Sequence, residues 1–313
     1  MSETWSDQRV VVTGGSGALG TCLVGKLIDA GAAQISILDL APPPVSRKGA
    51  VFHRCSILDC PELERQIGGC TVLFHFAAFA DAARSAAHPV ASVETNAIGV
   101  ARVLEAARRC GIRRFVYTST GHVYGRPRYL PVDEDHPVEP CSLYAAGKLA
   151  GEAFVRGYRA EFEMGAVIAR LANLYGASLG PNSVVGQAIE QTLAGKPIQL
   201  RSMGEIRDFL YIEDAAEALL SLSAGLVPAP SLHVVNVSTG HGTAIGEMAE
   251  ALAVAASCVG LPRPEILPPT GCPDAEIPVF VLDNRRLRAL CGSAVETSLR
   301  EGLMKTLTQR LAP

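Results

Sequence analysis

The segment Val10–Gly20 limits the possible folds of this chain more than any other segment. A run of strand-forming residues, Val10–Thr13, leads directly into Gly14, Gly17 and Gly20, and an amphipathic stretch follows. Glycines between a strand and a helix let the backbone approach a phosphate group closely, and the first helical turn presents free N–H groups to that group. We therefore expect a strand–turn–helix unit that binds phosphate.

The acid at the end of the next apolar run indicates which phosphate ligand is bound. Asp39 follows the run Gln34–Leu38 and lies about 20 residues beyond the glycine turn, where a carboxylate binds the ribose hydroxyls of a dinucleotide. It would repel a 2′-phosphate, and no arginine follows it directly. The sequence predicts NAD rather than NADP, bound by Gly14, Gly17, Ala18, Leu19 and Asp39. Asp59 is a further candidate, at the adenine edge, and an exposed turn acid is the alternative.

Short apolar runs alternate with longer amphipathic stretches as far as Arg170. This alternation is typical of βαβ units, which form a parallel sheet covered on both faces by helices. The composition, with 30 glycines and 5% aromatic residues, suits close packing of helices on such a sheet. We predict an α/β fold with a doubly wound parallel sheet, whose strands are Val10–Thr13, Gln34–Leu38, Val51–Arg54, Thr71–Phe76, Arg114–Thr118 and Ala166–Arg170.

Beyond Arg170 the alternation weakens, and glycine and proline become frequent. Domains average roughly 150 residues, so 313 residues allow two domains or one large unit. We predict a cofactor domain over residues 1–174, to which residues 200–225 return. Residues 175–313 would mainly form a smaller, interleaved substrate domain that is not contiguous in sequence.

Charge and cysteine content exclude several classes of protein. The 28 Lys and Arg against 31 Asp and Glu give a net charge of −3, without the single-sign field of a nucleic-acid or membrane-surface binder. No apolar run approaches the roughly 18 residues of a membrane span, and residues 1–9 do not resemble a signal peptide, so we expect a cytoplasmic protein. The nine cysteines include no C-x-x-C pair, so we expect neither a disulfide framework nor a metal site.

Tyr144 and Lys148 lie four residues apart in a predicted helix, so their side chains share one face. A phenol, with a pKa of about 10, is a poor base at neutral pH. A neighbouring ammonium group and the charge of NAD⁺ would favour the phenolate and lower that pKa. Such a pair is common by chance, and an amphipathic helix with a solvated lysine is the alternative.

Other segments accompany this pair in a fixed order. They are Gly14–Gly20, His75–Ala78, Asn96 with Gly99, Thr118–Thr120 with Val123–Gly125, Arg170–Gly176 and Arg207–Asp214. With them the chain resembles the extended short-chain dehydrogenase/reductase family, in particular the NAD-dependent nucleotide-sugar epimerase and dehydratase branch that includes enzymes like UDP-glucose/UDP-galactose 4-epimerase. The resemblance covers residues 9–311 and implies a Rossmann fold.

The resemblance also implies residue roles. Tyr144 would accept the proton of a sugar hydroxyl, Lys148 would bind the nicotinamide ribose and tune Tyr144, and Thr120 would hydrogen-bond the reacting oxygen. NAD would take the hydride, because no side chain can accept it. The remaining implied residues are Ala77, Ala78 and Asn96 at the cofactor and Ser119, His122, Asn173 and Arg207 at the substrate. Asn173 and Arg207 would bind a diphosphate, and a capped loop with an ion pair of Arg207 to Asp208 or Asp214 is the alternative.

Departures from the family pattern narrow the reaction. Dehydratases of the family carry Asp-Glu where this chain has Gly121 and His122. Glycine cannot transfer a proton, so we expect epimerisation, most of all at C4 of a UDP-hexose or UDP-hexuronate. We expect His122 to pack against or orient the substrate, and a titrating His122 is the alternative. The other functions left open are a sugar dehydrogenase or reductase and a non-catalytic NAD-binding sensor or scaffold.

The segment Pro269–Glu276 lacks the phosphate-binding arginine that the family usually places there. Either Arg201 or Arg263 supplies that second cation, or the substrate is not an ordinary nucleotide diphosphate sugar.

The Ala-rich helices predicted at Pro89–Cys110 and Ser142–Glu163 correspond to the pair that forms a dimer's four-helix bundle in the family. The resemblance therefore implies a homodimer, and packing of these faces inside the chain is the alternative.

Overall fold

The computed structural model describes residues 5–224, 231–271, 277–292 and 295–312. Its centre is a seven-stranded sheet with the strand order β10-β6-β5-β4-β1-β2-β3, and all of its neighbouring strands run parallel. The strands are β1 (Arg9–Thr13), β2 (Gln34–Asp39), β3 (Ala50–Arg54), β4 (Val72–His75), β5 (Arg114–Thr120), β6 (Gly165–Leu171) and β10 (Leu232–Val237). The predicted doubly wound α/β fold is confirmed.

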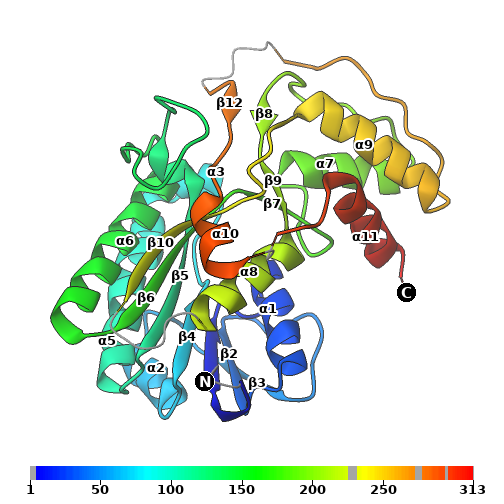
Figure 1. Cartoon of the computed structure of the whole chain (residues 1–313). Helices are drawn as coiled ribbons and strands as arrows, with labels where there is room; N and C mark the ends of the chain where they lie inside the picture. The colour runs from blue at the N-terminus through cyan, green and yellow to red at the C-terminus, as the bar shows by residue number, and fades with distance from the viewer. Residues whose placement is uncertain (1–4, 225–230, 272–276, 293–294, 313) are drawn as a thin grey trace.

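Helices cover both faces of the sheet (Figure 1). One face packs against α1 (Ala18–Asp29), α8 (Ile212–Ala224) and α10 (Arg285–Cys291). The other packs against α2 (Cys60–Ile67), α5 (Gly99–Arg109) and α6 (Leu143–Phe162). Burial on both faces explains why central strands such as β4 and β6 carry runs of adjacent apolar residues and not an alternating pattern.

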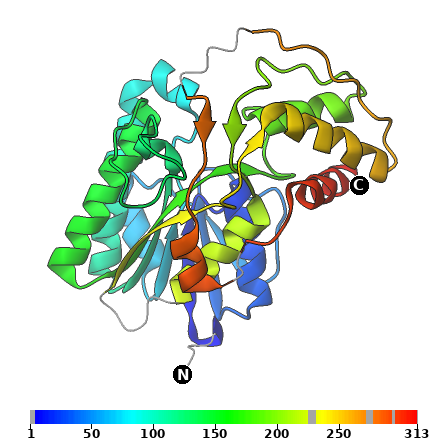
Figure 2. The ribbon, with the colours of Figure 1, turned by 45° about the horizontal axis from the view of Figure 1, so that its top comes forward.

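A smaller group of elements lies beyond the carboxyl edge of the sheet, around its own apolar cluster (Figure 2). It contains a three-stranded sheet in the order β11-β8-β12 and the parallel pair β7-β9. These elements are β7 (Asn173–Tyr175), α7 (Val184–Leu193), β8 (Ile206–Arg207), β9 (Phe209–Tyr211), β11 (Thr243–Ala244), α9 (Ile245–Cys258), β12 (Val279–Phe280) and α11 (Leu299–Leu311).

The remaining elements are short: η1 (Trp5–Asp7), α3 (Ala82–Ala87), α4 (Pro89–Val93), the π-helical turn η2 (Glu94–Ile98) and η3 (Gly121–Tyr124). The helix predicted at Pro89–Cys110 is thus divided into α4, η2 and α5. Among the residues that the structure describes, no helix combines the length and the apolar character needed to cross a bilayer.

The six predicted strands are all present. The seventh, β10, was not predicted, and it lies within residues 175–313, which we expected to form mainly the substrate side. The strand is at the edge of the sheet, its first half is only partly buried, and it carries the polar residues His233 and Asn236. An edge strand of mixed character lacks the continuous apolar run of the central strands.

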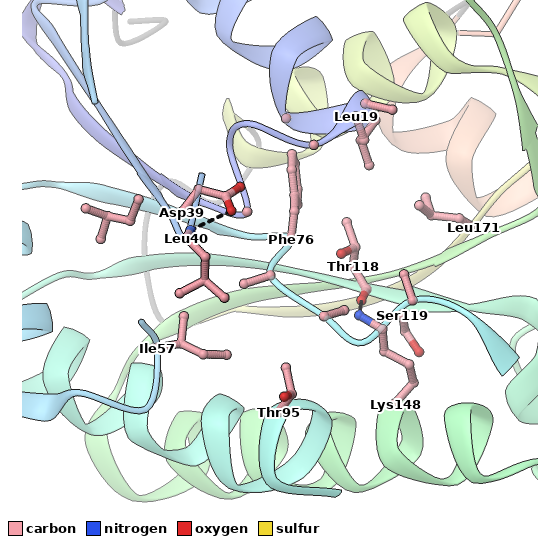
Figure 3. Close-up of a pocket in the computed structure, with 18 of the residues that line it drawn as sticks. Leu19, Asp39, Leu40, Ile57, Phe76, Thr95, Thr118, Ser119, Lys148 and Leu171 are labelled. Atoms are coloured by element: carbon pink, nitrogen blue, oxygen red, sulfur yellow. Dashed lines mark hydrogen bonds between the residues drawn. The ribbon is translucent and has the colours of Figure 1, made fainter. Parts of the chain in front are cut away.

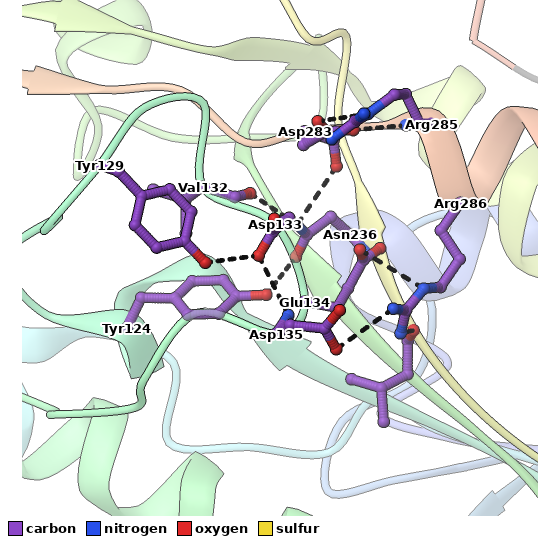
Figure 4. Close-up of polar contacts among 11 residues, drawn as sticks. Tyr124, Tyr129, Val132, Asp133, Glu134, Asp135, Asn236, Asp283, Arg285 and Arg286 are labelled. Atoms are coloured by element: carbon purple, nitrogen blue, oxygen red, sulfur yellow. Dashed lines mark hydrogen bonds and ion pairs between the residues drawn. The ribbon is translucent and has the colours of Figure 1, made fainter.

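The connection between η3 and α6 is fixed to this edge strand by polar contacts (Figure 4). The Tyr124 hydroxyl donates to Asn236 Oδ1 at 2.6 Å, and Asn236 Nδ2 donates to the Val132 carbonyl at 2.9 Å. Glu134 accepts from the Asn236 backbone N–H at 2.8 Å and faces Arg286 at 3.5 Å. The Glu134 bond pairs a backbone N–H that an edge strand would otherwise leave free, and the Asn236 side chain holds η3 beside the sheet.

Candidate active site

A cavity of about 520 Å³ opens at the carboxyl ends of the central strands (Figure 3). It lies where the strand order reverses around β1, which is the usual ligand-binding position of a doubly wound sheet. Most of the predicted cofactor and catalytic residues meet here. The predicted residues that line the cavity are Gly14, Gly17, Ala18, Leu19, Asp39, Ala77, Ala78, Ser119, Tyr144 and Lys148.

The turn between β1 and α1 requires glycine. Gly14 has φ +68°, and a Cβ there would lie 2.5 Å from the Ala77 backbone nitrogen. A Cβ on Gly20 would lie 2.5 Å from the Gly14 carbonyl oxygen. Gly17 caps α1 without a side chain, so no side-chain oxygen occupies the first N–H groups of the helix. This turn fits the pyrophosphate of a dinucleotide, which backbone donors at a helix N-terminus bind.

Asp39 ends β2 on the wall of the same cavity (Figure 3). Its carboxylate accepts hydrogen bonds from the backbone N–H groups of Ser16, at 3.0 Å, and Leu40, at 2.7 Å. The first bond ties the carboxylate to the glycine turn. Asp39 is thus held beside the phosphate-binding turn, where a ribose that follows the pyrophosphate would meet it.

Lys148 is buried, and its ammonium donates to the Thr118 carbonyl at 2.8 Å (Figure 3). The ammonium also lies 5.1 Å from the centre of the Tyr117 ring. Burial lowers the pKa of Lys148 to about 8, and the negative charge of Glu152 opposes that shift. The Lys148 side chain, which belongs to α6, is therefore fixed against the end of β5 and is not a solvated surface group.

Tyr144 stands one turn before Lys148, near the start of α6, where Ser142 Oγ accepts from the Ala145 N–H at 3.2 Å. Burial raises the pKa of the Tyr144 phenol to about 12, and a hydrogen bond with Thr120 opposes the rise. The expectation that Lys148 lowers this pKa is wrong for the protein chain by itself. Burial is the largest cause of the raised pKa, and the Lys148 ammonium donates to the Thr118 carbonyl and not to the phenol.

Three of the predicted catalytic and cofactor residues are not among those that line the cavity, and each has a clear structural position. Thr120 caps η3, accepting from the His122 N–H at 3.3 Å, and hydrogen-bonds Tyr144. Asn96 makes two hydrogen bonds to the backbone of Phe79, at 2.8 and 3.1 Å, and so fixes the loop that carries Ala77 and Ala78.

Asp59 is the third such residue. It caps α2, accepting from the Glu62 N–H at 3.3 Å, and lies at a separate surface depression beside Arg102. We predicted that Asp59 contributes to the cofactor site. The residues that line the cavity there are instead Ser56, Ile57 and Leu58, which were not predicted as site residues. Their position directly after β3 was the available signal, because ligands bind at the carboxyl ends of such strands.

The predicted substrate residues His122 and Arg207 lie close together, where η3 meets β8 and β12 of the smaller group of elements. The His122 ring stacks on Phe280 of β12, with ring centres 6.0 Å apart and planes at 11°. Phe280 is in turn the register partner of Arg207 on β8. Loss of solvent around the stacked imidazole and the positive charge of Arg207 lower the pKa of His122, although the residue as a whole is still exposed. A neutral His122 is therefore expected at pH 7.

The Arg207 guanidinium is fixed by backbone carbonyl groups. It donates to Ile206 at 2.9 Å, to Ile277 at 2.9 Å and to Pro278 at 3.3 Å. Within the described residues, Asp208 and Asp214 have other partners. Asp208 accepts from Thr239 and Gly240, and Asp214 accepts from Glu296 and Thr297. Neither Asp208 nor Asp214 therefore pairs with Arg207; burial lowers the pKa of Arg207, and the nearby negative charge of Glu205 opposes that shift. Asn173 lies beside it and donates to the Asp208 carbonyl at 3.3 Å.

The two candidates for a second cation differ in their surroundings. Arg263 is exposed and pairs with Glu250 at 2.8 Å, whereas Arg201 contacts Gly271 through a backbone hydrogen bond of 2.9 Å. The segment Pro269–Glu276 continues into residues 272–276, which lie outside the described residues. Among the described residues, no group of His, Cys, Asp or Glu is arranged to hold a metal ion.

Comparisons with known proteins agree with this geometry. Residues 10–238 match the family described as the NAD dependent epimerase/dehydratase family. A UDP-glucose 4-epimerase of Mycolicibacterium smegmatis is 32% identical over 314 residues, which cover 96% of this chain and 97% of that protein. A dTDP-glucose 4,6-dehydratase of Streptomyces niveus is 27% identical, over 96% of this chain and 91% of that protein.

The structure of the UDP-glucose 4-epimerase of Thermus thermophilus in complex with NAD has a TM-score of 0.83 to this chain. It is 31% identical, and the match covers 96% of this chain and 98% of that one. Sequence, fold and cavity thus lead to one assignment. The chain belongs to the NAD-dependent epimerase/dehydratase family and is an NAD-dependent enzyme of that family.

Proposed function

We propose that this enzyme epimerises C4 of a UDP-hexose or UDP-hexuronate through a transient 4-keto sugar. The observation that carries the proposal is the meeting of Tyr144, Lys148 and the Thr120 end of β5 at the cofactor cavity. An epimerase of this kind needs a base for one hydroxyl, a hydrogen-bond donor to the same oxygen and a cofactor close by.

Each of these groups has a defined task in the proposed reaction. NAD, when bound, supplies the acceptor of the C4 hydride and the donor that returns it to the opposite face of the keto sugar. Tyr144 takes the C4 hydroxyl proton and later gives it back, and Thr120 holds the same oxygen. Lys148, fixed at the Thr118 carbonyl, places a positive charge one helical turn from Tyr144.

The phenol of Tyr144 must lose its proton to act as a base. Its pKa of about 12 in the protein chain means that the phenolate is rare at neutral pH. The positive charge of oxidised NAD, held in the cavity that Tyr144 lines, would favour the phenolate. Base strength would thus develop when the oxidised cofactor is in place.

Two relatives favour different reactions, and the structure around η3 supports epimerisation. The M. smegmatis relative is named a 4-epimerase and the S. niveus relative a 4,6-dehydratase. Dehydration requires an acid and a base beside C5 and C6, in addition to Tyr144. A Cβ on Gly121 would lie 3.1 Å from Phe280 and 3.1 Å from Leu282, so an aspartate there requires both side chains to shift. His122 occupies the other position and is stacked on Phe280.

We propose that the substrate binds on the side of the cavity that faces the smaller group of elements. We propose that Arg207 and Asn173 bind the diphosphate, that Ser119 contacts the sugar, and that His122 orients it. The division into a cofactor domain and an interleaved substrate domain follows the same line. The elements β7, α7, β8, β9 and α9 would form the substrate side. Helix α8 instead packs on α1 with the cofactor sheet.

We propose a homodimer that pairs α5 and α6 of two chains. Support comes from apolar side chains that are exposed on neighbouring elements: Val90 on α4, Val93 on α4, Ile98 on η2 and Phe154 on α6. Light scattering at micromolar concentration should give twice the monomer mass, and a monomeric mass would contradict the proposal.

We also propose a cytoplasmic location, supported by the free thiols of the described cysteines.

The function is tested by incubating the purified enzyme with UDP-glucose, UDP-galactose and UDP-glucuronate and analysing the products by NMR. Epimers should form without added reductant, and Tyr144→Phe should abolish their formation. Stoichiometric accumulation of NADH at 340 nm would instead identify a dehydrogenase. Bound NAD with no turnover of any sugar nucleotide would identify a sensor or scaffold.

A further inference from the structure

Glu152 is a fully buried carboxylate on α6, one turn beyond Lys148, to which the proposed mechanism gives no role. All of its partners are buried polar groups. Ser119 Oγ donates to it at 2.6 Å, and Arg170 donates to it through Nε at 2.9 Å and through Nη2 at 2.7 Å. Arg170 is itself only 3% exposed. The result is a buried ion pair with an added serine bond.

This ion pair joins three elements at the edge of the active site. Glu152 belongs to α6, Arg170 to β6 and Ser119 to β5, and Ser119 and Arg170 are register partners in the sheet. Thr120 follows Ser119 directly, and Tyr144 and Lys148 precede Glu152 on the same face of α6. The ion pair therefore fixes the distance between the strand end that carries Thr120 and the helix face that carries Tyr144.

A buried ion pair of this kind contributes little net stability, because the desolvation cost offsets much of the attraction between the charges. The surroundings of Lys148 suggest what this pair adds. The titratable groups around the ammonium are His75 of β4, Tyr117 of β5, and Tyr144 and Glu152 of its own helix.

Among these neighbours, Glu152 supplies the negative charge. Burial lowers the pKa of His75 to about 3 and raises the pKa of Tyr117, so both groups are neutral at pH 7. Glu152 therefore opposes the effect of burial on Lys148. Arg170 lies on the other side of Glu152, with its guanidinium carbon 4.7 Å from the centre of the Tyr124 ring.

We propose that Glu152 is a positioning residue for the reaction, which fixes the Ser119–Thr120 end of β5 against α6 and supplies the negative charge that keeps Lys148 an ammonium. The proposal rests on the proposed function for the importance of Thr120 and Tyr144. Its electrostatic part concerns Lys148 alone and holds whichever sugar the enzyme uses.

The test compares variants that separate charge from contact. Glu152→Gln removes the charge and leaves the Arg170 guanidinium without a compensating carboxylate. Glu152→Asp keeps the charge but shortens the reach to Ser119. The double variant Glu152→Met with Arg170→Met removes both buried charges, and it serves if Glu152→Gln does not fold. Circular dichroism and NAD⁺ binding show which variants are folded.

The first readout is the ¹³C NMR titration of the lysine Cε signals, with Lys148 assigned through Lys148→Arg. Lys148 should titrate near pH 8 in the wild type, since its pKa is about 8. Removal of a nearby opposite charge lowers an ammonium pKa by about 1 unit or more. Lys148 should therefore lose its proton about one pH unit lower in Glu152→Gln, at a lower pH than wild type in the double variant, and near the wild-type pH in Glu152→Asp.

The second readout is kcat against pH in the cofactor-loaded enzyme. The alkaline limb of the profile should move to lower pH in Glu152→Gln by the shift that NMR gives, whereas Glu152→Asp should lower kcat about tenfold or more without moving that limb. A helix-packing role alone would reduce kcat uniformly and leave the Lys148 titration unchanged.

An unchanged Lys148 titration in folded Glu152→Gln, or in the double variant if only that one folds, would overturn the electrostatic part of the proposal. A wild-type kcat in Glu152→Asp would overturn the positioning part. If the wild-type enzyme epimerises no sugar nucleotide, the proposed function fails, and the NMR titration still decides whether Glu152 holds the proton on Lys148.

Discussion

The carboxylate of Asp39 should determine the choice between NAD⁺ and NADP⁺, and the substitution Asp39→Asn tests this. The carboxylate lies on the cavity wall, fixed by the Ser16 and Leu40 N–H groups at 3.0 and 2.7 Å. A hydrogen bond to a charged group contributes about 1.5–3 kcal/mol. Loss of one such bond to the ribose corresponds to roughly 10- to 150-fold weaker NAD⁺ binding.

The effect on NADP⁺ has the opposite sign. Two unit charges about 4 Å apart repel each other by about 4 kcal/mol at an effective dielectric constant of about 20. Asp39 is only partly buried, so solvent reduces this repulsion. Removing the charge should still tighten NADP⁺ binding by about tenfold or more, so the preference for NAD⁺ should fall by at least about 100-fold in total.

The assay is isothermal titration calorimetry of both cofactors with protein freed of bound nucleotide. Asp29→Asn is the matched control, because Asp29 is an exposed carboxylate at the far end of α1 from the glycine turn. Chemical denaturation checks that Asp39→Asn remains folded, since asparagine can accept only one of the two backbone bonds. Equal affinity of the wild type for the two cofactors, or an unchanged preference in Asp39→Asn, would refute the reasoning.

Three further predictions concern the turn and the proposed base. Gly20→Ala should weaken NAD⁺ binding at least about tenfold, measured by calorimetry, because its Cβ would lie 2.5 Å from the Gly14 carbonyl oxygen. Tyr144→Phe should lower kcat by about 10²- to 10⁴-fold in a coupled epimerase assay, the usual effect of losing a proton-transfer group. Absorbance at 295 nm against pH reports tyrosine ionisation, and the signal lost in Tyr144→Phe identifies Tyr144. Tyr144 should ionise near pH 12 in the chain by itself and at a lower pH with NAD⁺ bound. Ionisation at the same pH in both states would contradict the argument that the cofactor's charge favours the phenolate.

The parts of the fold and site that the sequence predicted are those encoded by short segments. Strand runs such as Val10–Val12 are continuously apolar because both faces of the sheet are covered, so they are visible in the sequence. The Gly14 turn is visible because the position at φ +68° permits little else. The cap of α2 was visible too. Asp59 is followed three residues later by Glu62, a pattern typical of a helix start, whereas we predicted an adenine contact for Asp59, with an exposed turn acid as the alternative.

The parts that were missed depend on contacts between distant segments. Glu152 looks like an ordinary helix acid in the sequence, and only the fold brings Ser119 and Arg170 to it. The phenol of Tyr144 was predicted to have a lowered pKa, because sequence spacing shows the nearby lysine but not the burial that outweighs it. Likewise, Phe280 reaches His122 only through the pairing of β12 with β8.

The central claim is that the reaction oxidises and reduces the same carbon within one active site. It is tested most directly with UDP-glucose and UDP-glucuronate that carry deuterium at C4. NMR of the products should show the C4 epimer with the deuterium still at C4 and no net NADH, since the hydride returns to the carbon that it left. Loss of the deuterium to solvent, or an oxidised sugar formed with one equivalent of NADH, would contradict the account.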